Sequence, residues 1–276
     1  MTAKFAQILE NIGRSTRYNL HSHTQFCDGH APMEQMVAGA IDAGLEHYGF
    51  SPHGPIPIPS PCNMGADTVE AYKAEVERLR RLHKGEIELY TGMEVDFLGP
   101  QWGPHSAEVQ AYGLDYIIGS VHFVPAQDGT YADTDGQPER FRRYVEEVFG
   151  GDLRYVVDTF FRQTISMIEA GGLDIVGHFD KIGLNASCMQ PDIEDRPWYA
   201  RHIADVVDAI AARGLIAEIN TKHYARWQRF FPSVRWWPLL RRAGIRVLVN
   251  SDAHDPHLTD ASRRTALDLW HNDSNS

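Results

Sequence analysis

The chain has 276 residues, a length that one large domain or two small ones can fill, and 43% of them are hydrophobic, enough for a sizeable core. The formal net charge of −11 argues against sequence-independent nucleic-acid binding, which requires clustered lysine and arginine. No stretch approaches the roughly 18 continuous apolar residues of a membrane span, and residues 1–15 hold no apolar run of signal-peptide length, so we expect a cytoplasmic protein without a membrane partner.

Short β-rich segments alternate along the chain with longer amphipathic segments. In chain order, the predicted elements are a strand at 18–20, a helix at 32–43, a strand at 47–50, a helix at 68–83, strands at 87–92 and 116–119, helices at 138–148 and 153–169, a strand at 174–176, a helix at 197–213, a strand at 215–219, a helix at 234–243, a strand at 246–249 and a helix at 260–269. The proline-rich segment 51–66 is predicted to be an ordered extended loop near the site, and 101–106 and 126–137 are predicted as further loops. Seven strands separated mainly by helices predict a parallel sheet, open or closed into a barrel.

Metal-ligand residue types follow the predicted strands in a regular way. His21 and His23 end the first strand, and because residues two apart in a strand point the same way, one ion could take both imidazoles. Asp252 and His254 repeat this spacing after the last strand. The second to fifth strands are followed by one candidate each, namely His53, Glu94, His122 and His178.

These residues share one position relative to the predicted strands. A lone histidine is usually a core or surface residue, but six of the seven predicted strands deliver a candidate ligand just past their C-terminal end. In a barrel or an open parallel sheet, those ends face one crevice. Imidazole and carboxylate together favour zinc, iron or manganese over calcium or magnesium. The number of candidates indicates more than one ion, and the carboxylate of Glu94 could bridge two of them.

Four motifs resemble the polymerase-and-histidinol-phosphatase (PHP) superfamily: His21-Ser22-His23, Phe50-Ser51-Pro52-His53, Gly119-Ser120-Val121-His122 and Ser251-Asp252-Ala253-His254. Segments 21–29, 92–97 and 175–182 are similar to its histidinol-phosphatase branch. The resemblance runs from about residue 18 to residue 254. It implies a distorted (β/α)7 barrel of the TIM-like kind, formed by one domain over residues 1–276.

The resemblance also implies a site for two to three divalent metal ions, zinc, manganese or iron. Its ligands fall into three overlapping sets: His21, His23, Glu94 and Asp252 for one ion; Glu94, His122 and His178 for a second; and His30, His53 and His254 for a third. Similar sequences often carry another residue in place of His30, and Asp28 is then the nearby substitute.

By the same resemblance, we expect hydrolysis of a phosphomonoester, L-histidinol phosphate, to L-histidinol and phosphate, a step of histidine biosynthesis. A hydroxide that bridges two of the ions would attack the phosphorus atom. Asp252 or His254 could assist proton transfer, and the sequence leaves both open.

Candidates for substrate contacts come from the loops. Lys222 and Arg226 follow the sixth strand and could hold the phosphate, unless they are ordinary solvated charges. Asp28 or Asp96 could receive the amine and imidazole of histidinol. No feature of the sequence marks an oligomer interface.

Three other classes of protein share parts of this pattern. The first is another phosphoesterase of the same superfamily, acting on a different small phosphomonoester or a phosphodiester; the charge of −11 disfavours a nuclease. The second is an amidohydrolase-type C–N hydrolase, which Glu94 and the Asp252-Ala253-His254 segment fit less well. The third is a regulatory protein on a decayed barrel, which would lack ligands that are present here.

Overall fold

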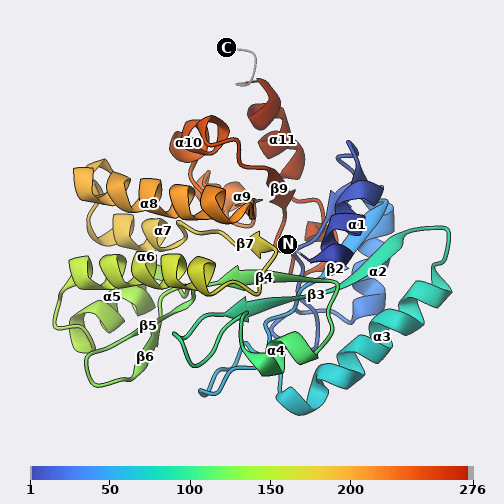
Figure 1. Ribbon diagram of the computed structural model, residues 1–276, viewed down its shortest axis with the longest axis horizontal. Helices are drawn as coiled ribbons and strands as arrows, with labels where there is room; N and C mark the ends of the chain where they lie inside the picture. Colours follow the sequence, from blue (N-terminus) through green and yellow to red (C-terminus); the bar gives the residue numbers. More distant parts are fainter. Residues whose placement is uncertain (1, 273–276) are drawn as a thin grey trace.

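The computed structural model describes residues 2–272, and within them seven parallel strands form a nearly closed barrel (Figure 1). The strands neighbour one another in chain order: β1 (Tyr18–Asn19), β2 (His47–Phe50), β3 (Glu88–Asp96), β4 (Tyr116–Ser120), β7 (Ile175–Val176), β8 (Ile216–Asn220) and β9 (Val247–Asn250). All seven predicted strands and the predicted barrel are confirmed.

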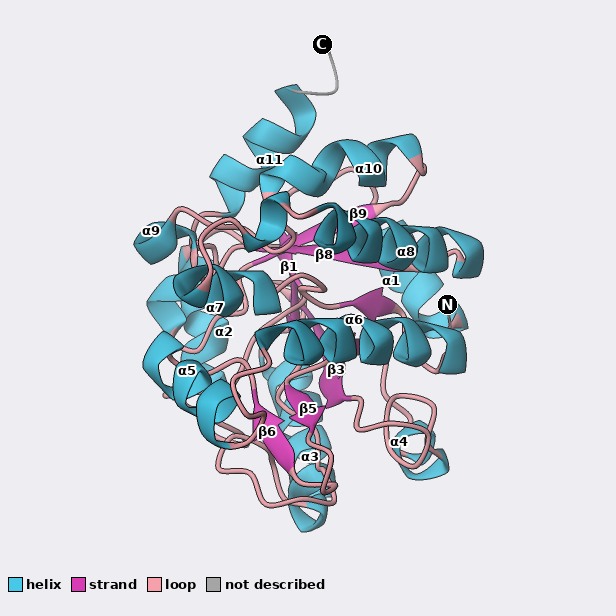
Figure 2. Ribbon diagram, turned by 90° about the vertical axis from the view of Figure 1, so that its left-hand side faces the viewer, coloured by secondary structure: helices cyan, strands magenta, loops and turns pink. Residues whose placement is uncertain are grey.

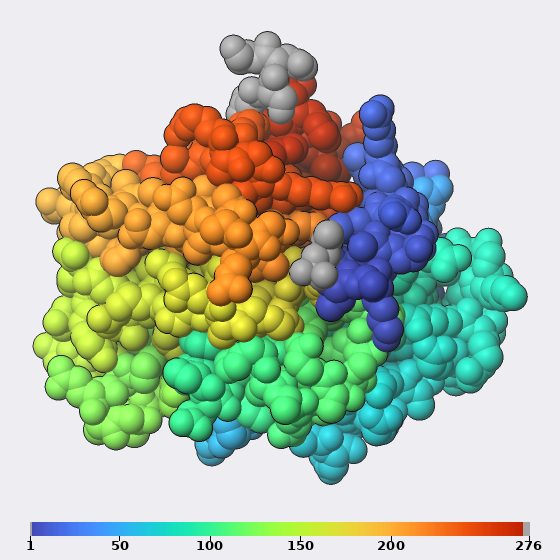
Figure 3. Space-filling view, in the orientation of Figure 1, coloured from blue at the N-terminus to red at the C-terminus, as the bar shows by residue number. Residues whose placement is uncertain are grey.

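The barrel closes between its first and last strands. Beyond the ends of β1 and β9, the His23 N–H donates to the Ala253 carbonyl at 2.8 Å, and the Ala253 N–H donates to the His21 carbonyl at 3.3 Å. Figure 3 shows the blue N-terminal segment lying against the orange and red C-terminal part. The closure is therefore a short seam and not a full ladder of hydrogen bonds.

Helices surround the strands on the outside, as Figure 2 shows. The predicted helices correspond to α2 (Met33–Asp42), α3 (Val69–Leu82), α5 (Pro138–Glu147), α6 (Leu153–Ala170), α8 (Pro197–Arg213), α10 (Trp237–Arg242) after the turn η3 (Val234–Trp236), and α11 (Arg263–Asn272). In α8, Pro197 occupies the first turn and Gly214 ends the helix with a φ of 59°. The last helix begins at Arg263, later than predicted, because Ser262 has a φ of 59°, which no α-helix accommodates. No helix of the described residues is both long and apolar enough to cross a membrane.

Several short elements were not predicted: α4 (Ala107–Ala111), β5 (Phe123–Pro125), β6 (Tyr131–Asp133), α7 (Ile182–Met189), α9 (Tyr224–Trp227), and the turns η1 (Ala66–Thr68), η2 (Ile193–Asp195) and η4 (Pro256–Leu258). Strand β6, which pairs with β5 in an antiparallel hairpin, falls in the predicted loop 126–137, so that prediction was wrong in part. Strands of three residues carry too little periodicity to be read from sequence.

The N-terminal helix α1 (Ala3–Ile12) was also missed. Its buried side chains, Phe5, Ile8, Leu9 and Ile12, have the spacing of one helical face. Lys4 Nζ donates to the Gly113 carbonyl at 2.7 Å, just before β4, so α1 lies at the N-terminal ends of the strands. There it packs against the side chains that fill the barrel, including Leu20, Tyr90, Tyr116, Ile118, Ile175, Ile216 and Leu248.

The inward-facing side chains of β4 and β8 change from apolar to polar along each strand. On β4, Tyr116 and Ile118 point into the apolar filling, and Ser120 and His122 follow at the same two-residue spacing. On β8, Ile216 is followed by Glu218 in the same way. The lower layers of the barrel are therefore a hydrophobic core, and the top layer is built of buried polar and charged groups.

Candidate metal centre

The predicted ligands gather at the C-terminal ends of the strands. His21, His122 and His178 each stand two residues beyond a strand, and all three are buried. Glu94 was predicted to follow the third strand, but it lies inside β3, because β3 continues to Asp96 in pairing with β4. The longer strand carries the carboxylate into the middle of the histidines.

Glu94 is the centre of the cluster. Its Oε2 lies 3.2 Å from His21 Nε2, 3.2 Å from His53 Nδ1 and 3.5 Å from His23 Nε2. Its Oε1 lies 2.8 Å from His178 Nε2 and 3.4 Å from His122 Nε2. The two oxygens of one carboxylate thus face two separate groups of imidazoles, the arrangement expected of a bridging ligand.

Several atoms at this centre are buried and have no hydrogen-bond partner among the described residues: His21 Nε2, His23 Nε2, Asp28 Oδ1, His53 Nδ1 and Glu94 Oε2. Buried polar atoms without partners are costly and are rare in folded proteins. Here they converge on one another, and imidazole nitrogen and carboxylate oxygen are together the donor set of zinc, manganese and iron. The residues therefore fit divalent metal ions.

Two carboxylates behind the cluster fix the orientation of its imidazoles. His21 Nδ1 lies 2.6 Å from Glu218 Oε1, and His122 Nδ1 lies 2.6 Å from Asp96 Oδ1. An ionised carboxylate only accepts hydrogen bonds, so each Nδ1 donates to its carboxylate and each Nε2 faces Glu94. Carboxylate–histidine pairs of this kind orient ligands and raise their basicity at metal sites.

The role of Glu218 was not predicted from the sequence. The available signal was a single acid in the otherwise apolar segment 215–219, which is unusual unless the carboxylate has a partner. Asp96 was considered as a substrate contact, but its oxygens accept from His122 and from the Asn63 amide.

The charged side chains of the cluster shift one another's pKa values. Burial by itself lowers the pKa of His21, but Glu218, Glu94 and Asp252 outweigh it and raise that pKa to about 10. Burial raises the pKa of Glu94, and His21 and the other nearby imidazoles more than reverse this, so the pKa is held well below its usual range. The buried carboxylates require positive charge beside them.

A second group at the rim joins His23, Asp28, His53 and His254, whose ligand atoms all lie within 4.8 Å of one another. Asp28 Oδ1 lies 3.4 Å from both His23 Nδ1 and His254 Nε2. His30 lies outside this group: its side chain is 68% exposed, and its Nδ1 lies 3.0 Å from Asp255 Oδ2. Of His30 and its possible substitute Asp28, the structure brings only Asp28 into the cluster.

Comparison with known proteins agrees with this geometry. The family model of the PHP domain matches residues 19–222. The chain belongs to the PHP domain family.

The chain is 32% identical, over 250 residues, to a probable histidinol-phosphatase of Deinococcus radiodurans, covering 86% of this chain and 85% of that relative. Its barrel resembles a proposed histidinol phosphatase of Listeria monocytogenes, with a TM-score of 0.80 and 18% identity over 90% of this chain and 99% of that chain. It also resembles the histidinol phosphate phosphatase of Lactococcus lactis subsp. lactis, solved with zinc, L-histidinol and phosphate, with a TM-score of 0.66 and 18% identity over 93% of both chains. The two structures establish the PHP fold of the barrel.

Asp252 and Lys222 lie beside the histidine cluster. Asp252 has a φ of 51°, an uncommon backbone conformation for a residue other than glycine. Its Oδ1 lies 3.1 Å from His23 Nε2 and 3.2 Å from Lys222 Nζ. Lys222 Nζ also lies 3.2 Å from His254 Nε2, so the predicted lysine stands directly beside the cluster.

Arg226, the other predicted phosphate contact, is exposed and stands apart from the PHP site. Its guanidinium lies over the Trp227 ring, 5.1 Å from the centroid. It lines a neighbouring hollow together with Lys181 and His223. The structure thus brings Lys222, but not Arg226, to the ligands.

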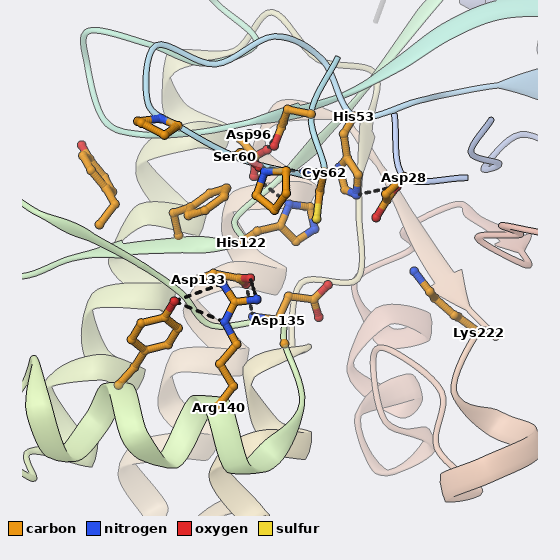
Figure 4. Close-up of a pocket in the computed structure, with 17 residues that line it drawn as sticks. Asp28, His53, Ser60, Cys62, Asp96, His122, Asp133, Asp135, Arg140 and Lys222 are labelled. Atoms are coloured by element: carbon orange, nitrogen blue, oxygen red, sulfur yellow. Dashed lines mark hydrogen bonds and ion pairs between the residues drawn. The ribbon is translucent and has the colours of Figure 1, made fainter. Parts of the chain in front are cut away.

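A cavity of about 290 Å³ opens beside the PHP cluster (Figure 4). One side is formed by the ligand-bearing residues Asp28, His53 and His122, together with Lys222. The proline-rich loop lines the cavity with residues 59–63, which agrees with its predicted position near the site. The hairpin β5–β6 and helix α5 contribute further lining residues. The cavity is large enough for a small phosphomonoester.

Proposed function

We propose that this chain is a metal-dependent phosphomonoesterase that hydrolyses L-histidinol phosphate to L-histidinol and phosphate, a step of histidine biosynthesis. The observation that carries the proposal is the set of buried, unpartnered ligand atoms that converge on Glu94 beside a small open cavity. The relative from Deinococcus radiodurans supports the substrate, as does the Lactococcus lactis structure, which holds zinc, L-histidinol and phosphate on the same fold.

We infer two to three divalent ions, zinc, manganese or iron. We propose the ligand sets expected from the resemblance, with Asp28 in place of His30: His21, His23, Glu94 and Asp252; Glu94, His122 and His178; and Asp28, His53 and His254. Ions bound there would lower the pKa of a water molecule toward neutrality and offset the charge of the phosphate.

The chain's own residues orient the reactants and move protons. Lys222 Nζ, beside Asp252 and His254, is placed to hold a phosphate oxygen. His254 Nδ1 lies 3.0 Å from the Asp252 carbonyl, which only accepts, so Nδ1 carries the hydrogen. In the neutral ring, Nε2 then keeps its lone pair, and it can ligate or accept a proton. Asp252 and His254 are our candidates for proton transfer.

The test is phosphate release by purified protein after chelation and dialysis. Zinc, manganese and iron are added back singly, with L-histidinol phosphate, AMP, glucose 6-phosphate and bis(p-nitrophenyl) phosphate as substrates. We expect metal-dependent turnover with the highest kcat/KM on L-histidinol phosphate. Equal activity without metal, or preference for the phosphodiester, would overturn the proposal.

A further inference from the structure

The hairpin β5–β6 brings Asp133 to the cavity beside the metal cluster. Asp133 is paired with Phe123, the residue that follows His122. The Thr134 N–H donates to the His122 carbonyl at 2.7 Å, and Thr134 Oγ1 donates to the same oxygen at 2.9 Å. The backbone that carries Asp133 is thus tied directly to a predicted metal ligand.

The other carboxylates that line the cavity already face a partner. Asp28 contacts the imidazoles of the rim group, and Asp96 accepts from His122 Nδ1. Asp135 Oδ2 lies 2.8 Å from the buried ammonium group of Lys181. Asp28 is thus proposed for the third ion, and Asp96 and Asp135 already face a donor of their own.

Asp133 is less well neutralised. Its Oδ1 accepts the Asp135 backbone N–H at 2.9 Å. Its Oδ2 has a single cation contact within the described residues, Arg140 Nη1 at 3.4 Å, and the same guanidinium donates to the Tyr144 hydroxyl at 3.0 Å. Burial and the neighbouring Asp135 raise the pKa of Asp133, which shows that nearby positive charge does not offset its partial burial.

The two ends of the cavity therefore carry different groups. Lys222, Asp28 and His53 lie at one end, where bound divalent ions would add positive charge, and Figure 4 shows Asp133, with Arg140 beside it, across the cavity from Lys222 and Asp28. L-Histidinol phosphate has the matching polarity, since its anionic phosphate and its cationic amine are attached to adjacent carbon atoms. Complementary charges at both ends of a site favour one ligand over neutral or wholly anionic competitors.

We propose that Asp133 determines specificity by receiving the protonated amine of L-histidinol phosphate while the phosphate occupies the Lys222 end of the cavity. This inference rests on the proposed function. It assigns to Asp133 the role for which the sequence offered Asp28 and Asp96.

The test compares Asp133→Asn with wild-type protein on L-histidinol phosphate and on its analogue without the amine, 3-(imidazol-4-yl)propyl phosphate. We expect kcat/KM for L-histidinol phosphate to fall roughly 10- to 100-fold, mainly through KM, because a charged hydrogen bond is lost. The value for the analogue should change less than about twofold. Asp128→Asn, at the exposed turn of the same hairpin, is the matched control and should leave both values unchanged.

Equal losses on both substrates would overturn the inference, because Asp133 would then act only by orienting Arg140 or the hairpin. Undiminished kcat/KM on L-histidinol phosphate would overturn it as well. If Asp133→Asn does not fold, Asp133→Glu replaces it, and retained preference for the amine-bearing substrate is the expected result. If the wild type does not hydrolyse L-histidinol phosphate, the proposed function fails separately, and phosphoethanolamine against ethyl phosphate then tests whether Asp133 selects an amine.

Discussion

Replacement of Glu218 by glutamine tests whether the carboxylate behind the cluster sets up the ligands. Four donors point at its two oxygens: His21 Nδ1 at 2.6 Å and Asn250 Nδ2 at 3.0 Å toward Oε1, and the His178 N–H at 3.1 Å and Asn220 Nδ2 at 3.2 Å toward Oε2. Glutamine has one acceptor oxygen, so in either orientation its NH2 group faces two of these donors.

The surrounding groups cannot adapt without a further loss. The Asn250 oxygen already accepts the Leu20 N–H at 2.9 Å, and the Asn220 oxygen accepts the Lys222 N–H at 3.1 Å, so neither amide can rotate freely. Two buried donors lose their acceptor, at about 1–3 kcal/mol each, and we expect Glu218→Gln to lower the free energy of unfolding of the metal-free protein by roughly 2–6 kcal/mol. Zinc affinity should fall about 10- to 100-fold, because His21 is left either without an acceptor or with a neutral amide oxygen in place of the carboxylate that orients it.

Urea unfolding of the metal-free protein measures the first effect, and competition with a zinc-binding dye measures the second. Glu88→Gln is the control, since Glu88 is exposed at the start of β3 and should leave both quantities unchanged. Wild-type zinc affinity in a folded Glu218→Gln protein would refute the reasoning that this carboxylate orients His21.

The remaining predictions concern individual ligands, the metal and one buried ion pair. His122→Ala should lower kcat at least roughly 100-fold in phosphate-release assays, because it removes a proposed metal ligand while the fold persists by circular dichroism. Asp28→Asn should weaken zinc binding roughly 10-fold or more in titration calorimetry. His30→Ala should leave zinc binding unchanged, since it removes only the exposed His30–Asp255 pair, and such pairs contribute about 0–1 kcal/mol. A larger loss of zinc affinity from His30→Ala than from Asp28→Asn would return His30 to the ligand set. Chelation should abolish turnover, and added zinc should restore it and raise the Tm. Arg229 binds buried Asp180 at 3.1 Å, so Arg229→Met should lower the urea-derived free energy of unfolding by about 3–5 kcal/mol, and an unchanged midpoint would contradict this.

The strands and most of the candidate ligands could be predicted because both depend on local sequence. Apolar runs mark the strands, and the residue after each run has its position fixed by the strand that precedes it. Asp28 and His30 could not be separated in this way, because the turn around Gly29 decides which side chain points inward. A Cβ at Gly29 would lie 2.2 Å from the Thr24 nitrogen, and such a close approach of two backbone segments has no simple signature in the sequence.

Other features were missed for different reasons. The pattern of Phe5, Ile8, Leu9 and Ile12 in α1 was present in the sequence and could have been found by the same periodicity rule. The partner of Glu218 could not, since His21 is 197 positions away in the chain and only the barrel brings the two together. Asp133 likewise depends on the pairing of a three-residue strand with a neighbour.

The short seam between β1 and β9 has a consequence for how the protein matures. His21 and His23 come from one side of it, and Asp252 and His254 come from the other, almost the whole chain later. An ion held by both sides would link the first and last strands across this short seam. Its full set of ligands would exist only once the two ends of the barrel have met, so metal binding and barrel closure would stabilise each other.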